Sequence, residues 1–505
     1  MAARSRCVLV TLILGLLPVL AAAQPRELGQ ADLVYRGSFT FENAGTTCSA
    51  GPRDFAYVQG VIAFNPARGS LFVVGHDHCQ HVAEFEVPEA GGVARLLQPF
   101  RDPTGGRMDE INPSDPGSKK IGGLHVAGDR LIVSVYSFYD AERTARTSHF
   151  VRPVNLGSDD VVGPLRVGSL NPGFYAGYMA GIPSEWQPVF GGDLFTGQCC
   201  LSIITRTSFG PSVSVARTAD FLQARGSINA RMLVGYPEDN TTLGDGTRQD
   251  PVFNRATQVR GVVLPKGTAS VLFFGYHGTG PYCYGEADEC GDPIHHGKGE
   301  HAYPYQPQVW AYRASELAEV SAGRRQPWTV RPYAVWRLPV LNDHRIGGVA
   351  YDEQSGRIFV LEVYGDGERP RVHVFAVRDE IVGDGGQTDG CSYALAMGAE
   401  PVHTGTLVRF PSASSQAVIT VEPSGASCRW TAWSGVEWLT VQPEEGTGFG
   451  QVSLLAPAYS GAIERVGYAF VAGWMFTVAQ NAPATAVPRQ RVIAPRRREP
   501  PVRVP

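Results

Sequence analysis

Lysine is scarce in this chain of 505 residues, and a strong excess of charge of either sign is absent. The 44 basic residues include only four lysines, Lys119, Lys120, Lys266 and Lys298, so nearly all cations are arginine. The formal net charge of −4 is too small to indicate a strongly charged partner. We therefore predict no nucleic-acid partner.

Long apolar segments are missing beyond the first 23 residues. Arg4 and Arg6 precede an apolar stretch from Val8 to Leu20, and residues 21–23 are all alanine. The stretch is too short to cross a bilayer, and this order is typical of a cleavable signal peptide over residues 1–23. An uncleaved anchor is the alternative. The sequence predicts a secreted or periplasmic protein with no transmembrane span.

The chain also lacks the common sequence signatures of catalysis and of cofactor binding. The chain has no Gly-x-Ser-x-Gly elbow, no His-Glu-x-x-His motif and no phosphate-binding P-loop. No cofactor is predicted, and whether the protein is an enzyme stays open.

Glycine and proline are abundant instead, with 59 and 37 residues, as expected for many short strands joined by turns. One pattern recurs five times: a small residue, an apolar strand, a turn, a second strand, a loop, a third strand and a further β-like run. The repeats open near Gly60, Gly123, Ala180, Gly261 and Gly348. The second strands are expected at 70–74, 130–135, 187–194, 270–275 and 357–363.

The fifth repeat lacks its final run, and one unassigned run, Asp32 to Phe41, remains at the start of the chain. A propeller has this arrangement when its first strand completes the last blade. The sequence therefore predicts an all-β chain with a five-bladed β-propeller over residues 30–380. Six blades and a large β-sandwich are the alternatives.

Eight cysteines follow the signal peptide, and an even number in an exported chain favours disulfides. Cys283 and Cys290 bracket a short loop and are expected to pair. Cys391 and Cys428 fall in one C-terminal module and are also expected to pair. A thiolate metal site is the alternative, but paired Cys-x-x-Cys spacing is lacking. The partners of the remaining cysteines stay undetermined: Cys48, Cys79, Cys199 and Cys200.

The region after the propeller divides into three parts. Residues 381–390 form a Gly- and Asp-rich linker, residues 391–482 form a second domain, and residues 483–505 form a tail rich in proline and arginine. The tail has almost no large apolar residues, so it is predicted to be disordered.

The second domain carries three motifs in a characteristic order. They are Cys428-Arg429-Trp430-Thr431-Ala432, Trp438-Leu439-Thr440-Val441 and a Gly-rich turn at 446–450. In this order they resemble the BACON family, small immunoglobulin-like β-sandwiches of exported bacterial proteins. The chain departs from that pattern at 456–459, where an asparagine is usual. The resemblance implies an accessory module with a carbohydrate-binding association.

A propeller would gather two sets of loops on one face: those before each inner strand and those between second and third strands. These loops hold most of the long polar and aromatic segments, which are the usual marks of a binding face. The predicted ligand-binding residues are His76, Asp77, Arg260, His277, Asp343 and His344.

His76 and His78 are weak candidates for a metal site, since residues two apart on an extended chain point the same way. Four other histidines could supplement them: His81, His295, His296 and His301. Nothing in the sequence fixes a third ligand, so no metal is predicted.

Two functions fit these observations. The first is a non-enzymatic exported binding protein whose propeller face takes a glycan or cell-surface polymer, with the BACON-like domain as an accessory. The alternative is a carbohydrate-active hydrolase, which needs two carboxylates facing each other across the funnel. Its candidate carboxylates are Asp54, Asp77, Asp343 and Glu362.

Overall fold

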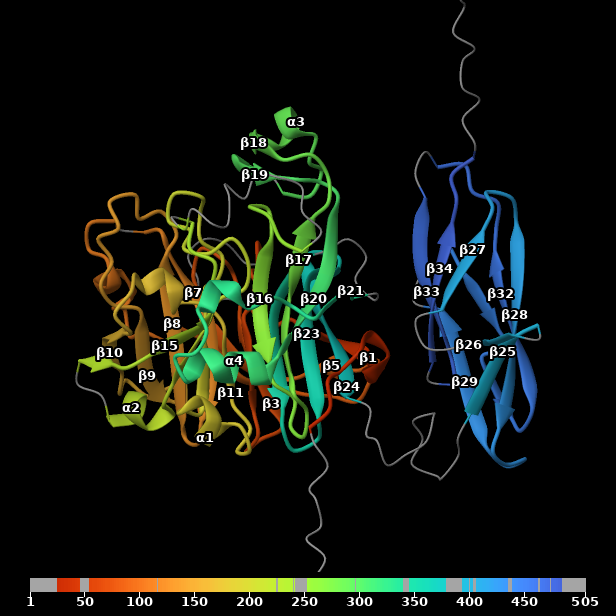
Figure 1. Ribbon diagram of the computed structural model, residues 1–505, viewed down its shortest axis with the longest axis horizontal. Helices are drawn as coiled ribbons and strands as arrows, with labels where there is room; N and C mark the ends of the chain where they lie inside the picture. The colour runs from red at the N-terminus through yellow and green to blue at the C-terminus, as the bar shows by residue number, and fades with distance from the viewer. Residues whose placement is uncertain are drawn as a thin grey trace, which may run out of the picture.

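The computed structural model contains an N-terminal β-propeller and a C-terminal β-sandwich (Figure 1). Among the residues that it describes, no helix has the length and apolar character needed to cross a bilayer. The described residues are 25–45, 54–115, 117–223, 226–238, 240, 252–295, 297–338, 345–377, 393–398, 400–402, 406–434, 438–461, 464–472 and 474–483.

The propeller has five antiparallel blades of four strands each, as the five repeats predict. From the inner to the outer strand, blade 1 comprises β2 (Ile62–Asn65), β3 (Ser70–Val74), β4 (Val82–Glu86) and β6 (Leu96–Arg101), and blade 2 comprises β7 (Lys119–Ala127), β8 (Arg130–Ser137), β9 (His149–Pro153) and β10 (Val162–Val167). Blade 3 comprises β11 (Met179–Gly181), β12 (Leu194–Thr196), β13 (Val213–Ala216) and β15 (Arg231–Val234), and blade 4 comprises β16 (Gln258–Val263), β17 (Ser270–Gly278), β20 (Tyr305–Arg313) and β21 (Ala334–Arg337). Blade 5 comprises β22 (Ile346–Asp352), β23 (Arg357–Asp366), β24 (Arg369–Val377) and β1 (Leu33–Phe41).

Shorter elements decorate the blades. Four are strands outside the four-strand pattern. β5 (Val93–Ala94) is parallel to β1, β14 (Ser227–Ile228) is parallel to β10, and β18 (Cys283–Gly285) pairs with β19 (Gly299–His301). The described helices are α1 (Gln187–Phe190), α2 (Thr218–Gln223), α3 (Ala287–Cys290) and α4 (Ala314–Ser321), with 3-10 turns η1 (Gln30–Asp32), η2 (Met108–Ile111), η3 (Pro172–Phe174) and η4 (Pro327–Thr329).

The first strand closes the ring. β1 pairs antiparallel with β24, in a register that runs from Leu33 opposite Val377 to Thr40 opposite Arg371. Each inner strand also contacts the inner strands of both neighbouring blades, so β2, β7, β11, β16 and β22 surround one axis. The predicted role of residues 32–41 as the closing strand is confirmed.

Glycines at the inner strands let neighbouring blades approach each other. A Cβ on Gly123 would lie 2.1 Å from the carbonyl oxygen of Gly177 in blade 3, and a Cβ on Gly348 would lie 2.4 Å from that of Gly60 in blade 1. Both distances are below any real contact, so side chains are excluded at these positions. The small residues that open the repeats are therefore a requirement of the close packing around the axis.

The second strand expected at 187–194 is wrong for most of its length. Residues Gln187–Phe190 form helix α1, and β12 begins only at Leu194. Pro188 fits the first turn of a helix, where its missing N–H costs no hydrogen bond. Gly191 ends the helix in a left-handed conformation with φ of 77°. The ring of Phe190 stacks on Trp186, with centroids 5.6 Å apart.

The C-terminal domain is a sandwich of two five-stranded sheets. One sheet has the order β26 (Glu400–Val402), β25 (Tyr393–Met397), β28 (Ser415–Pro423), β32 (Gly450–Ala456) and β30 (Thr440–Gln442). The other has the order β27 (Leu407–Phe410), β34 (Trp474–Gln480), β33 (Arg465–Val471), β29 (Arg429–Ser434) and β31 (Glu445–Thr447). Trp430 and Trp474 are buried in the core between them.

The sandwich contacts the propeller through aromatic rings. Trp433 stacks on Phe470 with centroids 4.1 Å apart, and Tyr35 of β1 lies 5.6 Å from Trp433 and 5.0 Å from Phe470. Trp433 is therefore engaged at the domain interface, although 38% of its surface is exposed.

The predicted disulfide between Cys283 and Cys290 is present, and Cys199 and Cys200, left unassigned by the sequence, bond to each other. Cys79 and Cys428 are also disulfide-bonded. Cys48 and Cys391 lie outside the described residues.

Candidate functional site

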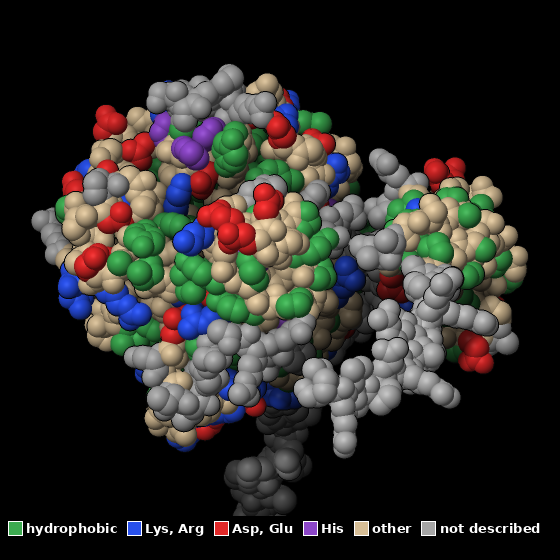
Figure 2. All heavy atoms as spheres, turned by 90° about the horizontal axis from the view of Figure 1, so that it is seen from above, with side chains coloured by type: hydrophobic (Ala, Val, Ile, Leu, Met, Phe, Trp, Pro, Cys, Tyr) green, Lys and Arg blue, Asp and Glu red, His purple; other side chains and the backbone are tan. Residues whose placement is uncertain are grey.

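Two sets of segments meet on one face of the propeller, which we call the loop face. They precede the inner strands or join the second strands to the third strands. The insertion between β17 and β20, which carries β18, α3 and β19, projects from this face at the top of Figure 1. Figure 2 looks onto the face and shows apolar, cationic and histidine side chains interspersed on it. The opposite face carries the tight turns after the inner strands, and we call it the hairpin face.

Exposed aromatic residues mark the loop face. In the described part of the propeller, four large aromatic side chains are exposed: Tyr57, Phe138, Tyr139 and Tyr284, with 64%, 43%, 56% and 50% of their surface accessible. Tyr57 precedes inner strand β2, and the other three lie between second and third strands. All four are thus on one face, although nothing in the packing of the blades requires that distribution.

Cations from three blades lie at the ends of inner strands on the same face. Each of β7, β16 and β22 has a register shift, after Ile121, Val259 and Ile346 respectively. Arg260 is the extra residue of the shift in β16. Bulges of this kind re-aim side chains and recur beside functional sites.

Lys120 and Arg345 occupy equivalent positions in blades 2 and 5, two residues before the extra residue of each shift. Lys120 Nζ donates to Asp77 Oδ2 at 2.7 Å and to the Asp77 carbonyl at 2.9 Å. The predicted site residue Asp77 is therefore neutralised by a neighbouring blade.

His76 and His78 flank Asp77 in the sequence and lie next to Tyr57. The backbone N–H of His78 donates to His76 Nδ1 at 3.2 Å, and the Tyr57 ring lies 5.6 Å from His78. Burial and the charge of His78 lower the pKa of His76, while Asp77 opposes this shift. No group of three His, Cys, Asp or Glu residues able to hold a metal ion occurs among the described residues.

Arg260 reaches a vicinal disulfide and a tyrosine. Its Nη1 lies 2.8 Å from Cys200 Sγ, its Nη2 donates to Tyr276 Oη at 3.5 Å, and its guanidinium carbon lies 5.9 Å from the Tyr276 ring. Burial raises the pKa of the neighbouring Tyr136, the charge of Arg260 opposes that rise and the charge of Asp77 adds to it. The charges of Asp77 and Arg260, from blades 1 and 4, therefore both act on Tyr136 of blade 2.

The insertion of blade 4 brings His295 toward the same group. Its ring lies 5.4 Å from Tyr276 and 4.3 Å from Tyr305. Burial lowers the pKa of His295 to about 3, and the charges of Arg345 and Arg260 contribute in the same direction. His295 is thus a neutral imidazole within electrostatic reach of both arginines.

Asp292 holds this insertion in place. Its Oδ2 accepts from Tyr305 Oη at 2.6 Å and lies 2.8 Å from His301 Nδ1, while Oδ1 accepts from the backbone N–H groups of Ile294 and His295. Burial would raise the pKa of Asp292, but these hydrogen bonds together lower it to about 2.

The depressed pKa of Asp292 predicts a specific dependence of stability on pH. Its folded pKa of about 2 lies below the ordinary 3.8, so the unfolded chain binds more protons between these values. The contribution is complete above about pH 4 and is lost as the pH falls toward 2. Asp292→Asn should therefore flatten the slope of unfolding free energy against pH between 2 and 4, measured by urea titration. Asp288→Asn, an exposed acid of the same insertion, should leave the slope unchanged; equal slopes for the two variants would contradict the assignment.

The other predicted residues take different positions. His277 is 3% exposed, and its Nδ1 lies 2.9 Å from Thr257 Oγ1, so it presents little surface to a ligand. Asp343 and His344 lie outside the described residues. The sequence did not single out Tyr136 or the Cys199–Cys200 bond, and it indicated His295 only as a possible supplementary metal ligand.

Two of the carboxylates proposed for a hydrolase are used inside the fold. Asp54 Oδ2 accepts from the backbone N–H of Ala44 at 2.9 Å and from Arg369 at 3.2 Å. Glu362 Oε2 lies 2.8 Å from His373 Nε2, and both residues are buried. Each carboxylate therefore has a partner within the fold.

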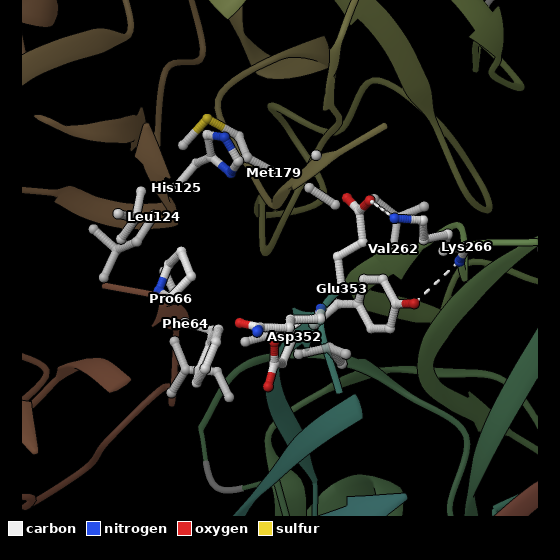
Figure 3. A pocket seen from close by; sticks show the side chains of 18 residues that line it. Phe64, Pro66, Leu124, His125, Met179, Val262, Lys266, Asp352 and Glu353 are labelled. Atoms are coloured by element: carbon white, nitrogen blue, oxygen red, sulfur yellow. Dashed lines mark hydrogen bonds and ion pairs between the residues drawn. The ribbon is translucent and has the colours of Figure 1, made fainter. Parts of the chain in front are cut away.

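A cavity of about 420 Å³ lies at the hairpin-face end of the axis (Figure 3). Apolar side chains from inner strands form much of its wall, including Phe64, Leu124 and Met179. Its charged groups are paired: Lys266 Nζ lies 3.1 Å from Glu353. The sequence does not predict this cavity, because the turns around it are short and carry no distinctive motif.

No protein-family model and no curated protein matches the chain. Among solved structures, it is similar to a GH130 protein from work on glycoside hydrolases that target β-1,2-mannosidic linkages in Candida mannan, with 10% identity, coverage of 71% of this chain and 95% of the other, and a TM-score of 0.36. It is also similar to sucrose-6-phosphate hydrolase from Lactobacillus gasseri, with 8% identity, 86% and 88% coverage and a TM-score of 0.36. A xyloglucanase of family GH5 from Bacteroides ovatus matches at 18% identity over 17% of this chain and 19% of its own length, with a TM-score of 0.15. Likenesses at this level do not decide a function.

Proposed function

We propose that the chain is an exported binding protein whose propeller takes a glycan on the loop face. The observation that carries the proposal is the gathering there of the four exposed aromatic residues, Tyr57, Phe138, Tyr139 and Tyr284. Flat aromatic rings pack against the apolar faces of sugars, while neighbouring polar groups bond to the hydroxyls. The cations, histidines and tyrosines between the rings supply such groups.

The sandwich serves in this proposal as an accessory module, in keeping with its resemblance to the BACON family. Its tryptophans lend no support to a second sugar site, because Trp430 and Trp474 are buried and Trp433 packs at the domain interface. Phe449, 68% exposed, is the aromatic residue of the sandwich most accessible to a ligand.

A glycan-array screen of the mature protein tests the proposal, followed by calorimetric titration of the best ligand. Tyr57→Ala and Tyr139→Ala should each weaken binding about fivefold to tenfold, the loss expected from one stacked ring. Phe449→Ala is the matched control and should leave the affinity unchanged. If Phe449→Ala alone weakens binding, the glycan site lies on the sandwich and the proposal is wrong.

A carbohydrate-active hydrolase is the second candidate, and the position of Asp77 favours it. The charge of this carboxylate acts on Tyr136, as does that of Arg260, where chain segments of several blades meet. Incubating the wild-type protein with the glycans that it binds, and measuring new reducing ends, decides between the two. Hydrolysis that Asp77→Asn abolishes would establish the enzyme; intact glycan after prolonged incubation would support the binding protein.

A further inference from the structure

Arg260 and Arg345 differ from Arg206 and Arg152, two buried arginines of the propeller, in what surrounds them. Arg206, for comparison, lies 3.0 Å from Glu300 Oε2, and Arg152 donates to a set of backbone carbonyls. Neither Arg260 nor Arg345 forms an ion pair with a carboxylate of the described residues, and the Nε of each is buried without a hydrogen-bond partner. Arg260 is only 7% exposed.

An arginine keeps its charge at every accessible pH, so burial cannot be relieved by losing a proton. A buried cation without a counter-charge is costly, and each orphaned donor calls for an explanation. Lys120 does not share this position, because Asp77 neutralises it. The uncompensated positive charge of this part of the loop face therefore belongs to Arg260 and Arg345.

The surroundings of the two arginines suit a ligand. Each guanidinium lies over a tyrosine ring, Arg260 over Tyr276 at 5.9 Å and Arg345 over Tyr364 at 5.7 Å. Such rings stabilise a cation without occupying its N–H groups. His295, whose Nε2 is likewise buried without a hydrogen-bond partner, lies against Tyr276 and within reach of both charges. Three buried nitrogens without a hydrogen-bond partner thus come from blade 4, its insertion and blade 5: Arg260 Nε, His295 Nε2 and Arg345 Nε.

We propose that Arg260 and Arg345 bind the oxyanion of an acidic sugar, a carboxylate such as that of a uronic acid, with His295 as an additional polar contact. This inference rests on the proposed function and names its ligand class. A guanidinium matches a carboxylate with two parallel N–H···O bonds, and these charge-assisted bonds are stronger than neutral ones. The exposed aromatics of the same face then pack against the sugar ring that carries the acid.

The test compares one glycan in two charge states. Oligogalacturonate and its fully methyl-esterified form are titrated into the full mature chain by calorimetry, with a sulfated oligosaccharide as a third ligand. The acid form should bind at least about tenfold more tightly than the ester. Arg260→Gln and Arg345→Gln should each remove that difference by weakening binding of the acid form to about the level of the ester. Lys266→Gln, which removes the same charge on the hairpin face, should change neither.

Equal binding of the acid and the ester would overturn the inference and leave the glycan-binding proposal standing, whereas no binding of any glycan on the array would overturn both. Preference for the sulfated oligosaccharide, lost in Arg260→Gln, would support the oxyanion site with a sulfate ester in place of the carboxylate. Arg260→Lys keeps the charge but loses the paired N–H geometry, so a partial loss of the preference in this variant supports the site even if Arg260→Gln unfolds. An effect of Lys266→Gln equal to that of Arg345→Gln would overturn the assignment.

Discussion

A protein that lacks β1, with residues 25–41 deleted, is expected to lose its folded monomeric state. β1 supplies the outer strand of blade 5, and its removal leaves β24 with an unpaired edge along Arg371 to Val377. Unpaired edges recruit other chains and promote aggregation. Phe39 and Phe41 are 1% and 2% exposed, and burial of each contributes about 1.5–3 kcal/mol, a large share of a typical stability of about 5–15 kcal/mol.

Size-exclusion chromatography and differential scanning calorimetry measure this result. The matched control removes residues 489–505 of the Pro- and Arg-rich tail, a deletion that should leave the elution volume and melting temperature unchanged. A β1-deleted protein that elutes as a monomer and melts at the wild-type temperature would contradict ring closure by this strand.

Replacement of Glu84 by alanine is expected to have the second-largest effect. Glu84 is fully buried between strands of blade 1, and its carboxylate accepts from Asn65 Nδ2 at 2.9 Å, from Arg68 Nη1 at 2.7 Å, from Ser70 Oγ at 2.5 Å and from Gln98 Nε2 at 2.6 Å. Removing one partner of a buried charged pair typically costs about 3–5 kcal/mol. The remaining groups are then left without the counter-charge and without their hydrogen bonds.

Urea denaturation of Glu84→Ala should therefore show a midpoint far below the wild type, with a similar dependence on urea. Glu86→Ala is the control on the same strand, since its partner Arg95 is exposed and the pair is screened by solvent. If both variants unfold at the same urea concentration, the buried network of Glu84 does not support the blade.

The architecture could be predicted because it is repetitive. Five openings with small residues and one unassigned strand at the start determine both the number of blades and the closing strand. The structure explains the small residues, since Gly123 and Gly348 pack against backbone of the next blade. The expected strand at 187–194 was wrong for most of its length because Pro188 and Gly191 favour a short helix there.

The site could be predicted only in part, because topology places positions on a face but does not reveal side-chain partners. Asp77 and Arg260 both belong to loop-face segments, and the charges of both act on Tyr136. Asp54 instead forms a hydrogen bond with Arg369, a residue 315 positions away, and no local sequence pattern predicts such a pair. Tyr136 was missed, and His295 was considered only as a metal ligand, for the same reason: the environment of each depends on the burial that the assembled blades create.

The central claim, that the loop face of the propeller binds glycan, is tested most directly by one titration series. The best ligand from the array is titrated into the wild type, the Tyr57→Ala/Tyr139→Ala double variant and Phe449→Ala, after thermal melting has shown that all three are folded. We predict that the double variant loses at least about tenfold in affinity and that Phe449→Ala binds as tightly as the wild type. Wild-type affinity in the double variant would contradict the account.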